Sequence, residues 1–148
     1  DIGTWDLHNV KNMDYMFSNS SFNTDISNWN TENVINTDNM FSCGTFDKDI
    51  SGWNVKKLHN AYGMFSHNEN FNCDISQWEL PSILDMCHMF DSTKFTHDVS
   101  NWSKYINHET EFSHMFFGTY DLYGIEKLFK RVKKQKLNEY YETTPLCI

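Results

Sequence analysis

The stretch Asp25-Ile26-Ser27-Asn28-Trp29, with Met40-Phe41 eleven residues after the tryptophan, decides the fold because the chain repeats it. The phrase starts at Asp1, Asp25, Asp49, Asp74 and Asp98, in steps of 24, 24, 25 and 24 residues. The matching pairs are Met16-Phe17, Met40-Phe41, Met64-Phe65, Met89-Phe90 and, two residues late, Met115-Phe116. A fixed period of this length is typical of a solenoid, in which each repeat forms one unit that stacks on the next.

The order of apolar residues inside one repeat predicts two kinds of local structure. After Trp29, apolar or small side chains follow at spacings of three, three and one, which fits one face of a short helical or 3-10 segment. They are Val34, Thr37, Met40 and Phe41. The stretch 22–29 carries Phe, Ile and Trp between Asn and Ser residues, which predicts a brief strand that pairs in parallel with its neighbours. The fold class expected from these patterns is an α/β repeat.

Composition and charge narrow the classes of function. The chain has 148 residues, about one domain, and a formal net charge of −8. The acidic residues are concentrated in residues 1–117, and this argues against nucleic-acid binding by the repeats, because phosphate contacts need clustered Lys and Arg. No run of 18 or more apolar residues occurs, so no membrane-spanning segment is predicted.

The four cysteines, Cys43, Cys73, Cys87 and Cys147, fall at unrelated places in the repeat and form no C-x-x-C pair. This favours free thiols over disulfides and, with them, a reducing folding compartment.

The sequence predicts two parts, a repeat solenoid over residues 1–117 and a closing segment over residues 118–148. Within 119–142, apolar residues follow the i, i+3, i+4, i+7 pattern of an amphipathic helix. They are Ile125, Leu128, Phe129 and Val132. We expect this helix to cover the last repeat. The chain begins inside the repeated phrase, so we expect it to be a processed or partial product, with further repeats or a neighbouring chain on the N-terminal side.

The phrase Phe22-Asn23-Thr24-Asp25-Ile26-Ser27-Asn28-Trp29-Asn30-Thr31-Glu32-Asn33-Val34, closed by Met40-Phe41, resembles the BspA-like leucine-rich repeat family, which includes mycoplasma lipoprotein-type repeats of unknown function. The likeness covers about residues 1–117. It implies a right-handed, leucine-rich-repeat-like solenoid with a narrow parallel sheet, in proteins exposed on cell surfaces, secreted, or found in large DNA viruses. The chain departs from the family pattern at Thr37, at Ala61 and at Leu80-Pro81. The resemblance carries no catalytic residues.

No motif for catalysis, a metal or a cofactor is found: the chain lacks a G-x-S-x-G, a glycine-rich phosphate loop, an H-E-x-x-H and a zinc-spaced ligand set. We therefore expect no catalytic residue, no metal ligand and no cofactor. The aspartates that head each phrase would repel one another at a rung spacing of roughly 5 Å. They must reach solvent or accept backbone N–H groups in Asx-type turns. A row of bound cations is the alternative.

The sequence favours a non-enzymatic structural or protein-interaction solenoid, on a cell surface or a virus particle, bound to a protein partner or to neighbouring subunits. The expected partner-binding positions vary between repeats. They are Asn23, Thr24, Asn28, Lys48, Gly52, Asn72, Gln77, Thr96, His97 and Asn101. Two alternatives stay open: a bacterial-type adhesin, and an anion, nucleic-acid or membrane-surface contact through the basic C-terminal helix. Its basic residues are Lys127, Lys130, Arg131, Lys133, Lys134 and Lys136.

Overall fold

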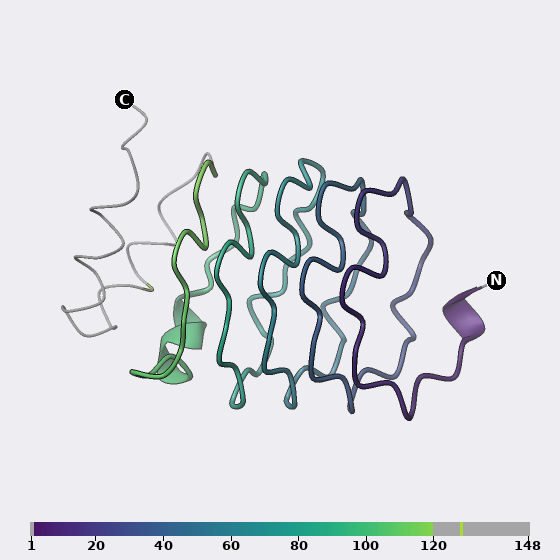
Figure 1. The fold of residues 1–148 in the computed structure, drawn as a ribbon, viewed down its shortest axis with the longest axis horizontal. Helices are drawn as coiled ribbons and strands as arrows, with labels where there is room; N and C mark the ends of the chain where they lie inside the picture. Colours follow the sequence, from purple (N-terminus) through teal and green to yellow (C-terminus); the bar gives the residue numbers. More distant parts are fainter. Residues whose placement is uncertain (1, 120–127, 129–148) are drawn as a thin grey trace.

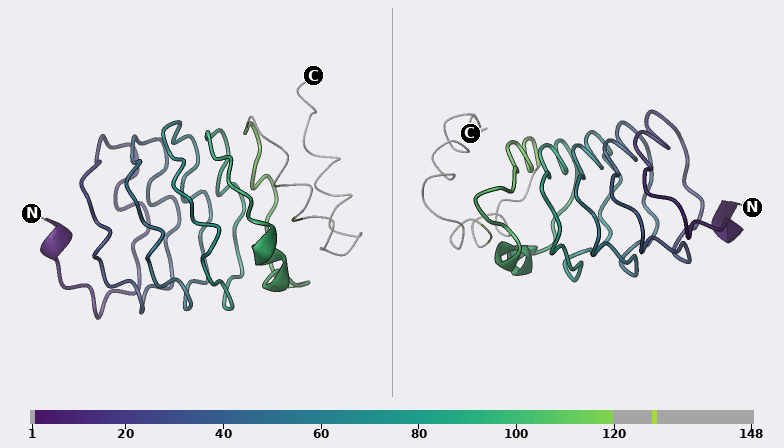
Figure 2. Two further views of the ribbon diagram at one scale, coloured as in Figure 1. Left: turned by 180° about the vertical axis from the view of Figure 1, so that it is seen from behind. Right: turned by 60° about the horizontal axis from the view of Figure 1, so that its bottom comes forward.

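The structure, a computed structural model, describes residues 2–119 and 128, and its main body is a single row of stacked coils (Figure 1). Isolated parallel bridges join equivalent positions of successive coils, from Asn12 to Asn36, Asn60, Asp85 and Glu111. We call each coil a rung and number the rungs 1 to 5 by these five residues. Figure 2 shows the same regular order from behind and from below. The expected stacking of the repeats in register is confirmed.

The expected fold class, an α/β repeat with short strands and a C-terminal amphipathic helix, is wrong. The described residues contain two 3-10 helices, η1 (Ile2–Thr4) and η2 (Ser100–Lys104), and their bridges are single residues rather than strands. The segment expected to form the C-terminal helix lies outside the described residues, apart from residues at its start and Leu128, which is buried.

The rungs are joined by hydrogen bonds in the segment that was expected to be helical. Backbone N–H groups at four alternate positions, 13, 15, 17 and 19, donate to the carbonyls at 36, 38, 40 and 42 of the next rung, at 2.8 to 2.9 Å. Four equivalent bonds join each later pair of rungs. The segment expected to be a strand, residues 22–29, makes no such backbone bond to the next rung within the described part of the chain. The segment expected to be helical therefore pairs with the next rung, and the segment expected to be a strand does not.

Two residues with positive φ in each rung explain why this ladder is neither helix nor strand. The pairs are Tyr15 and Asn19, Asn39 and Cys43, Gly63 and His67, His88 and Ser92, and His114 and Gly118, with φ between 51° and 68°. Each left-handed residue turns the chain before a helical turn or an extended run can continue. At Gly63 an added Cβ would lie 2.6 Å from Oδ1 of Asn39, so a larger residue there would require the Asn39 side chain to move.

Columns of apolar side chains fill the inside of the row. The phenylalanines of the Met-Phe pairs stack from rung to rung with ring centroids 5.3 to 5.8 Å apart. Trp5, Trp29 and Trp53 form a second column, with successive centroids 6.2 Å apart. Stacked pairs at these separations stabilise by about 0.5–1.5 kcal/mol beyond the area they bury. The constant period of the sequence is therefore a requirement of the core.

The indole N–H groups add a further link between rungs. Trp29 donates to the carbonyl of Ile2 at 2.9 Å, and Trp53 and Trp78 donate to Ile26 and Ile50 at 3.2 Å. Trp102 is fully buried, but its N–H has no hydrogen-bond partner within the part of the chain that the structure describes. The helix η2 lies at this position, and it accommodates the two extra residues before Met115-Phe116.

Candidate interaction face

The sequence-predicted partner positions lie in the segments between the Phe and the Trp of each phrase. We call the outer side of these segments, residues 23–28, 47–52, 72–77 and 96–101, the lateral face. Its inward-pointing residues, Ile26, Ile50, Ile75 and Val99, are each 0% exposed. The residues around them are mostly exposed or half-buried, and all ten positions that were predicted to bind a partner are among these. The buried aliphatic side chains therefore anchor a polar outer surface.

The aspartate row of the lateral face is held by local backbone. Oδ1 of Asp25, Asp49, Asp74 and Asp98 accepts the backbone N–H of the serine two residues later, at 2.9 to 3.0 Å. Hydrogen bonds from the backbone N–H and then the hydroxyl of Ser27 lower the pKa of Asp25. The hydroxyl and N–H of Ser51 and of Ser76 likewise lower the pKa of Asp49 and Asp74. The expected Asx-type turns are confirmed.

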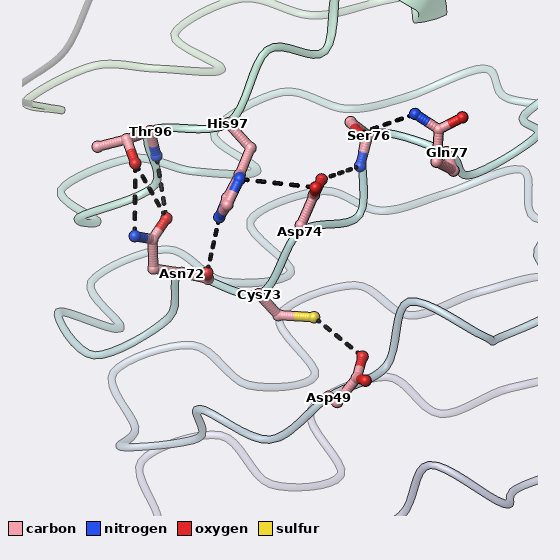
Figure 3. Close-up of polar contacts among 8 residues, drawn as sticks. All are labelled: Asp49, Asn72, Cys73, Asp74, Ser76, Gln77, Thr96 and His97. Carbon is pink, nitrogen blue, oxygen red and sulfur yellow. Dashed lines mark hydrogen bonds and ion pairs between the residues drawn. The ribbon is translucent and has the colours of Figure 1, made fainter.

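Asparagine side chains clamp neighbouring rungs together on this face. Oδ1 of Asn23 accepts the backbone N–H of Asp47 at 3.0 Å. Two rungs further along, Oδ1 of Asn72 accepts the backbone N–H of Thr96 at 3.1 Å. Nε2 of His97 lies 2.9 Å from the backbone carbonyl of Asn72 (Figure 3). The structure thus brings Asn72, Thr96 and His97 together.

The other predicted positions do not converge on one point. Lys48 pairs with the neighbouring Asp47 at 2.8 Å, and Gln77 donates to the hydroxyl of Ser76 at 3.1 Å. Thr24 and Asn28 are exposed on the first segment of the face, and Asn101 is exposed on the last. The face is an extended surface, and these residues supply separate contact points along it.

Cys73, Asp74 and His97 are residue types that could make a nucleophilic site, but their geometry does not assemble one. Nδ1 of His97 lies 3.8 Å from Oδ2 of Asp74, whereas the thiol of Cys73 points to Oδ1 of Asp49 at 3.5 Å (Figure 3). Burial, followed by the contact with Asp49, raises the pKa of Cys73, so its thiol stays protonated. Within the described residues, no three His, Cys, Asp or Glu side chains form a group that could hold a metal ion.

A hollow of about 210 Å³ lies beside the lateral face at the corner between rungs 3 and 4. Ser51, Asn54, Lys56, Gln77 and Glu79 are among its lining residues. Lys56 and Glu79 form an ion pair of 3.0 Å across the two rungs. Sequence reasoning missed Asn54, Lys56 and Glu79. Laying the repeats side by side would have placed them at one corner, because each lies within three residues of its tryptophan.

The predicted anion-binding set lies outside the described residues, so nothing is said of its structure. The set consists of Lys127, Lys130, Arg131, Lys133, Lys134 and Lys136. Within the described residues, no helix has the length and apolar character needed to cross a membrane.

The comparison with protein families matches the chain over two overlapping ranges. The family described as "Mycoplasma protein of unknown function, DUF285" matches residues 1–102 and, in an overlapping second alignment, residues 42–128. No curated protein and no solved structure matches the chain. The two alignments together span most of the sequence and all five rungs. The chain therefore belongs to the family of Mycoplasma proteins of unknown function, DUF285.

Proposed function

We propose that this chain is a non-enzymatic protein-interaction solenoid of the BspA-like leucine-rich repeat type, which binds a protein partner through its lateral face. The observation that carries the proposal is the construction of that face. Four segments hold equivalent polar side chains in rows. Local turns fix the aspartate row, and the clamps from Asn23 and Asn72 tie neighbouring segments together.

Preorganisation is the physical reason why such a surface suits binding. Side chains that are already held by hydrogen bonds lose less conformational freedom when a partner docks, so more of the contact energy appears as affinity. The exposed residues Asn28, Gln77 and Asn101 supply hydrogen-bonding groups along one line of the face, six residues after the Phe of their phrases. The adjacent corner hollow offers space for a partner side chain next to Gln77.

The setting that we propose for this role is a cell surface or a virus particle, where the chain is a scaffold component or an adhesin. Its supports are the family match and the resemblance of the repeated phrase to surface-protein repeats. The protonated thiol of Cys73 and the scattered polar groups of the face fit binding better than covalent catalysis.

A pair of matched double variants tests the proposal. Asn28→Arg with Gln77→Arg places two bulky cations on the lateral face. The control, Tyr62→Arg with Ser113→Arg, places the same cations at exposed positions in the hydrogen-bonded segment of rungs 3 and 5. Thermal melts first establish that both variants fold.

The readout is complex formation with proteins of the native source, measured by co-sedimentation. We expect the unaltered chain and the control variant to form the same complex, and the lateral-face variant to lose at least about ten-fold in affinity, since hot-spot contacts are worth 2 kcal/mol or more. The proposal is rejected if the chain forms no complex with any protein, or if both variants bind equally well.

A further inference from the structure

The corner hollow between rungs 3 and 4 combines buried apolar side chains with exposed polar ones. Its volume is about 210 Å³, and its buried lining residues are Trp53, Val55 and Trp78. The other lining residues are polar and come from both rungs. They are Ser51, Asn54, Lys56, Gln77 and Glu79. A hollow with this lining suits a side chain that has an apolar body and a polar end.

Three side chains offer hydrogen-bond acceptors to such an occupant. Nε2 of Gln77 donates to the hydroxyl of Ser76 at 3.1 Å, which leaves the amide oxygen of Gln77 as an acceptor (Figure 3). Oδ1 of Asn54 accepts the backbone N–H of Lys56 at 3.3 Å, a long bond that leaves room for a second donor. The carboxylate of Glu79 accepts hydrogen bonds and donates none. The occupant should therefore be rich in N–H donors.

The charge around the hollow favours a cation. Lys56 and Glu79 pair at 3.0 Å, but their side chains are 58% and 56% exposed, and exposed ion pairs of this kind contribute little net stability. A ligand that binds Glu79 through more hydrogen bonds can therefore displace Lys56. Asp49 and Asp74 lie on the adjoining segments of the lateral face, and the serine hydroxyl and N–H groups described above lower the pKa of each. Both carboxylates therefore stay ionised and add negative charge beside the hollow.

We propose that the corner hollow receives an arginine side chain of the protein partner, whose guanidinium binds the carboxylate of Glu79 in place of Lys56. A guanidinium is planar, carries five N–H donors and pairs with a carboxylate through two parallel hydrogen bonds. A lysine ammonium is a compact charge and matches the spread of acceptors less well. An acidic side chain would be repelled by Glu79, Asp49 and Asp74. The proposal rests on the proposed function and deepens it by naming the partner residue that the hollow selects.

A small probe tests the hollow without the partner. Nα-acetylarginine amide is added to the full chain, and the NMR signals of the side-chain amides of Asn54 and Gln77 report binding. Nα-acetyllysine amide has the charge without the planar group, and Nα-acetylcitrulline amide has nearly the same shape without the charge. We expect the arginine probe to shift both amide signals and to bind at least about ten-fold more tightly than either control. Equally tight binding of the lysine probe would overturn the proposal.

Matched variants identify the contact. Glu79→Gln keeps the size of the side chain and removes its charge, and Glu32→Gln does the same at an exposed position outside the hollow. Thermal melts first establish that both variants fold. Glu79→Gln should then weaken binding of the arginine probe at least about ten-fold, because charge-assisted hydrogen bonds are lost, and Glu32→Gln should leave it unchanged. Lys56→Gln should bind the probe more tightly than the unaltered chain, because it removes the competitor for Glu79. If Glu79→Gln kept the full affinity for the probe, the assigned contact would be wrong.

Complex formation separates this proposal from the proposed function. In co-sedimentation with proteins of the native source, Glu79→Gln should weaken the complex at least about ten-fold relative to Glu32→Gln. A complex that Glu79→Gln leaves intact refutes the arginine contact and not the interaction solenoid. The absence of any complex refutes the proposed function and the partner with it, and the probe titration then decides alone whether the hollow selects arginine.

Discussion

Replacing Trp102 by Phe should destabilise the chain far less than replacing Trp53 by Phe. Both indoles are buried and stack in the core, so both substitutions remove a similar apolar area and leave a similar gap. They differ in one hydrogen bond. The N–H of Trp53 donates to the carbonyl of Ile26 at 3.2 Å, whereas the N–H of Trp102 is buried without a partner among the described residues.

The size of the difference follows from the two N–H groups. Losing the bond of Trp53 costs about 0.5–1.5 kcal/mol, while removing an unsatisfied buried donor at position 102 returns about 1–3 kcal/mol. The free energies of unfolding of the two variants should therefore differ by roughly 2–4 kcal/mol in favour of Trp102→Phe. Trp78→Phe is the matched control, because its bond to the carbonyl of Ile50 is also 3.2 Å long. It should behave like Trp53→Phe.

Urea unfolding followed by the remaining tryptophan fluorescence measures the three variants. The comparison is valid when the slope of the free energy against urea is the same for all three. If Trp102→Phe lost as much stability as Trp53→Phe, the reasoning from the unpaired N–H would be wrong.

Three further outcomes are expected. Gly63→Ala should lower the free energy of unfolding by roughly 1–3 kcal/mol, because residue 63 has a positive φ and the new Cβ would clash with the Asn39 side chain. Gly52→Ala should be nearly neutral in the same urea titration, because an added Cβ there meets nothing within 4 Å. The pKa of Asp49 is lowered in the folded state, so the stability that its charge contributes is complete above pH 3.8 and is lost as the pH falls further. Asp49→Asn should therefore flatten the dependence of the urea midpoint on pH between 5 and 2. If the midpoint of this variant depended on pH as steeply as that of the unaltered chain, the prediction would be wrong. The thiol of Cys87, whose pKa is raised to about 12 by burial and then by Asp85, should react with iodoacetamide at pH 8 at least roughly 100-fold more slowly than the exposed Cys43, as read by peptide mass spectrometry.

The register of the rungs could be predicted from the sequence, but their secondary structure could not. The tryptophans and the Met-Phe pairs keep a constant spacing, because each must lie over its equivalent in the next rung. The spacing of three, three and one fits a helix equally well, and the residues that interrupt the helix carry no clear signal. Tyr15 and His88 adopt a positive φ although neither is glycine or asparagine. Their backbone N–H groups donate to carbonyls of the next rung, and this pairing helps to hold the positive φ.

On the lateral face, too, some features could be predicted from the sequence and others could not. Its Asx-type turns are local, from an aspartate to the serine two residues later, and for this reason they could be predicted from the phrase alone. The contacts of Asn72 with Thr96 and His97 depend on a rung offset of 24 or 25 residues and on the side-chain rotamers of residues in separate rungs. The sequence identified these residues as variable positions, but it gave no reason to group them.

The alignment of the ladder gives the molecule an electrical consequence that grows with its length. Each peptide group carries a dipole of about 3.5 D, and in ordinary sheets these dipoles nearly cancel. Here four peptide dipoles per rung add along the stacking axis. In each pair of rungs they are opposed by bonds to a single carbonyl, which belongs to Lys11, Ile35, His59 or Leu84. The stack therefore behaves like an α-helix of large cross-section, with its negative pole at the N-terminal end. Each additional rung adds to the total dipole moment, whereas the field at either end is set mainly by the peptide groups of the terminal rung, so the N-terminal carbonyls favour a positively charged neighbour whatever the number of repeats.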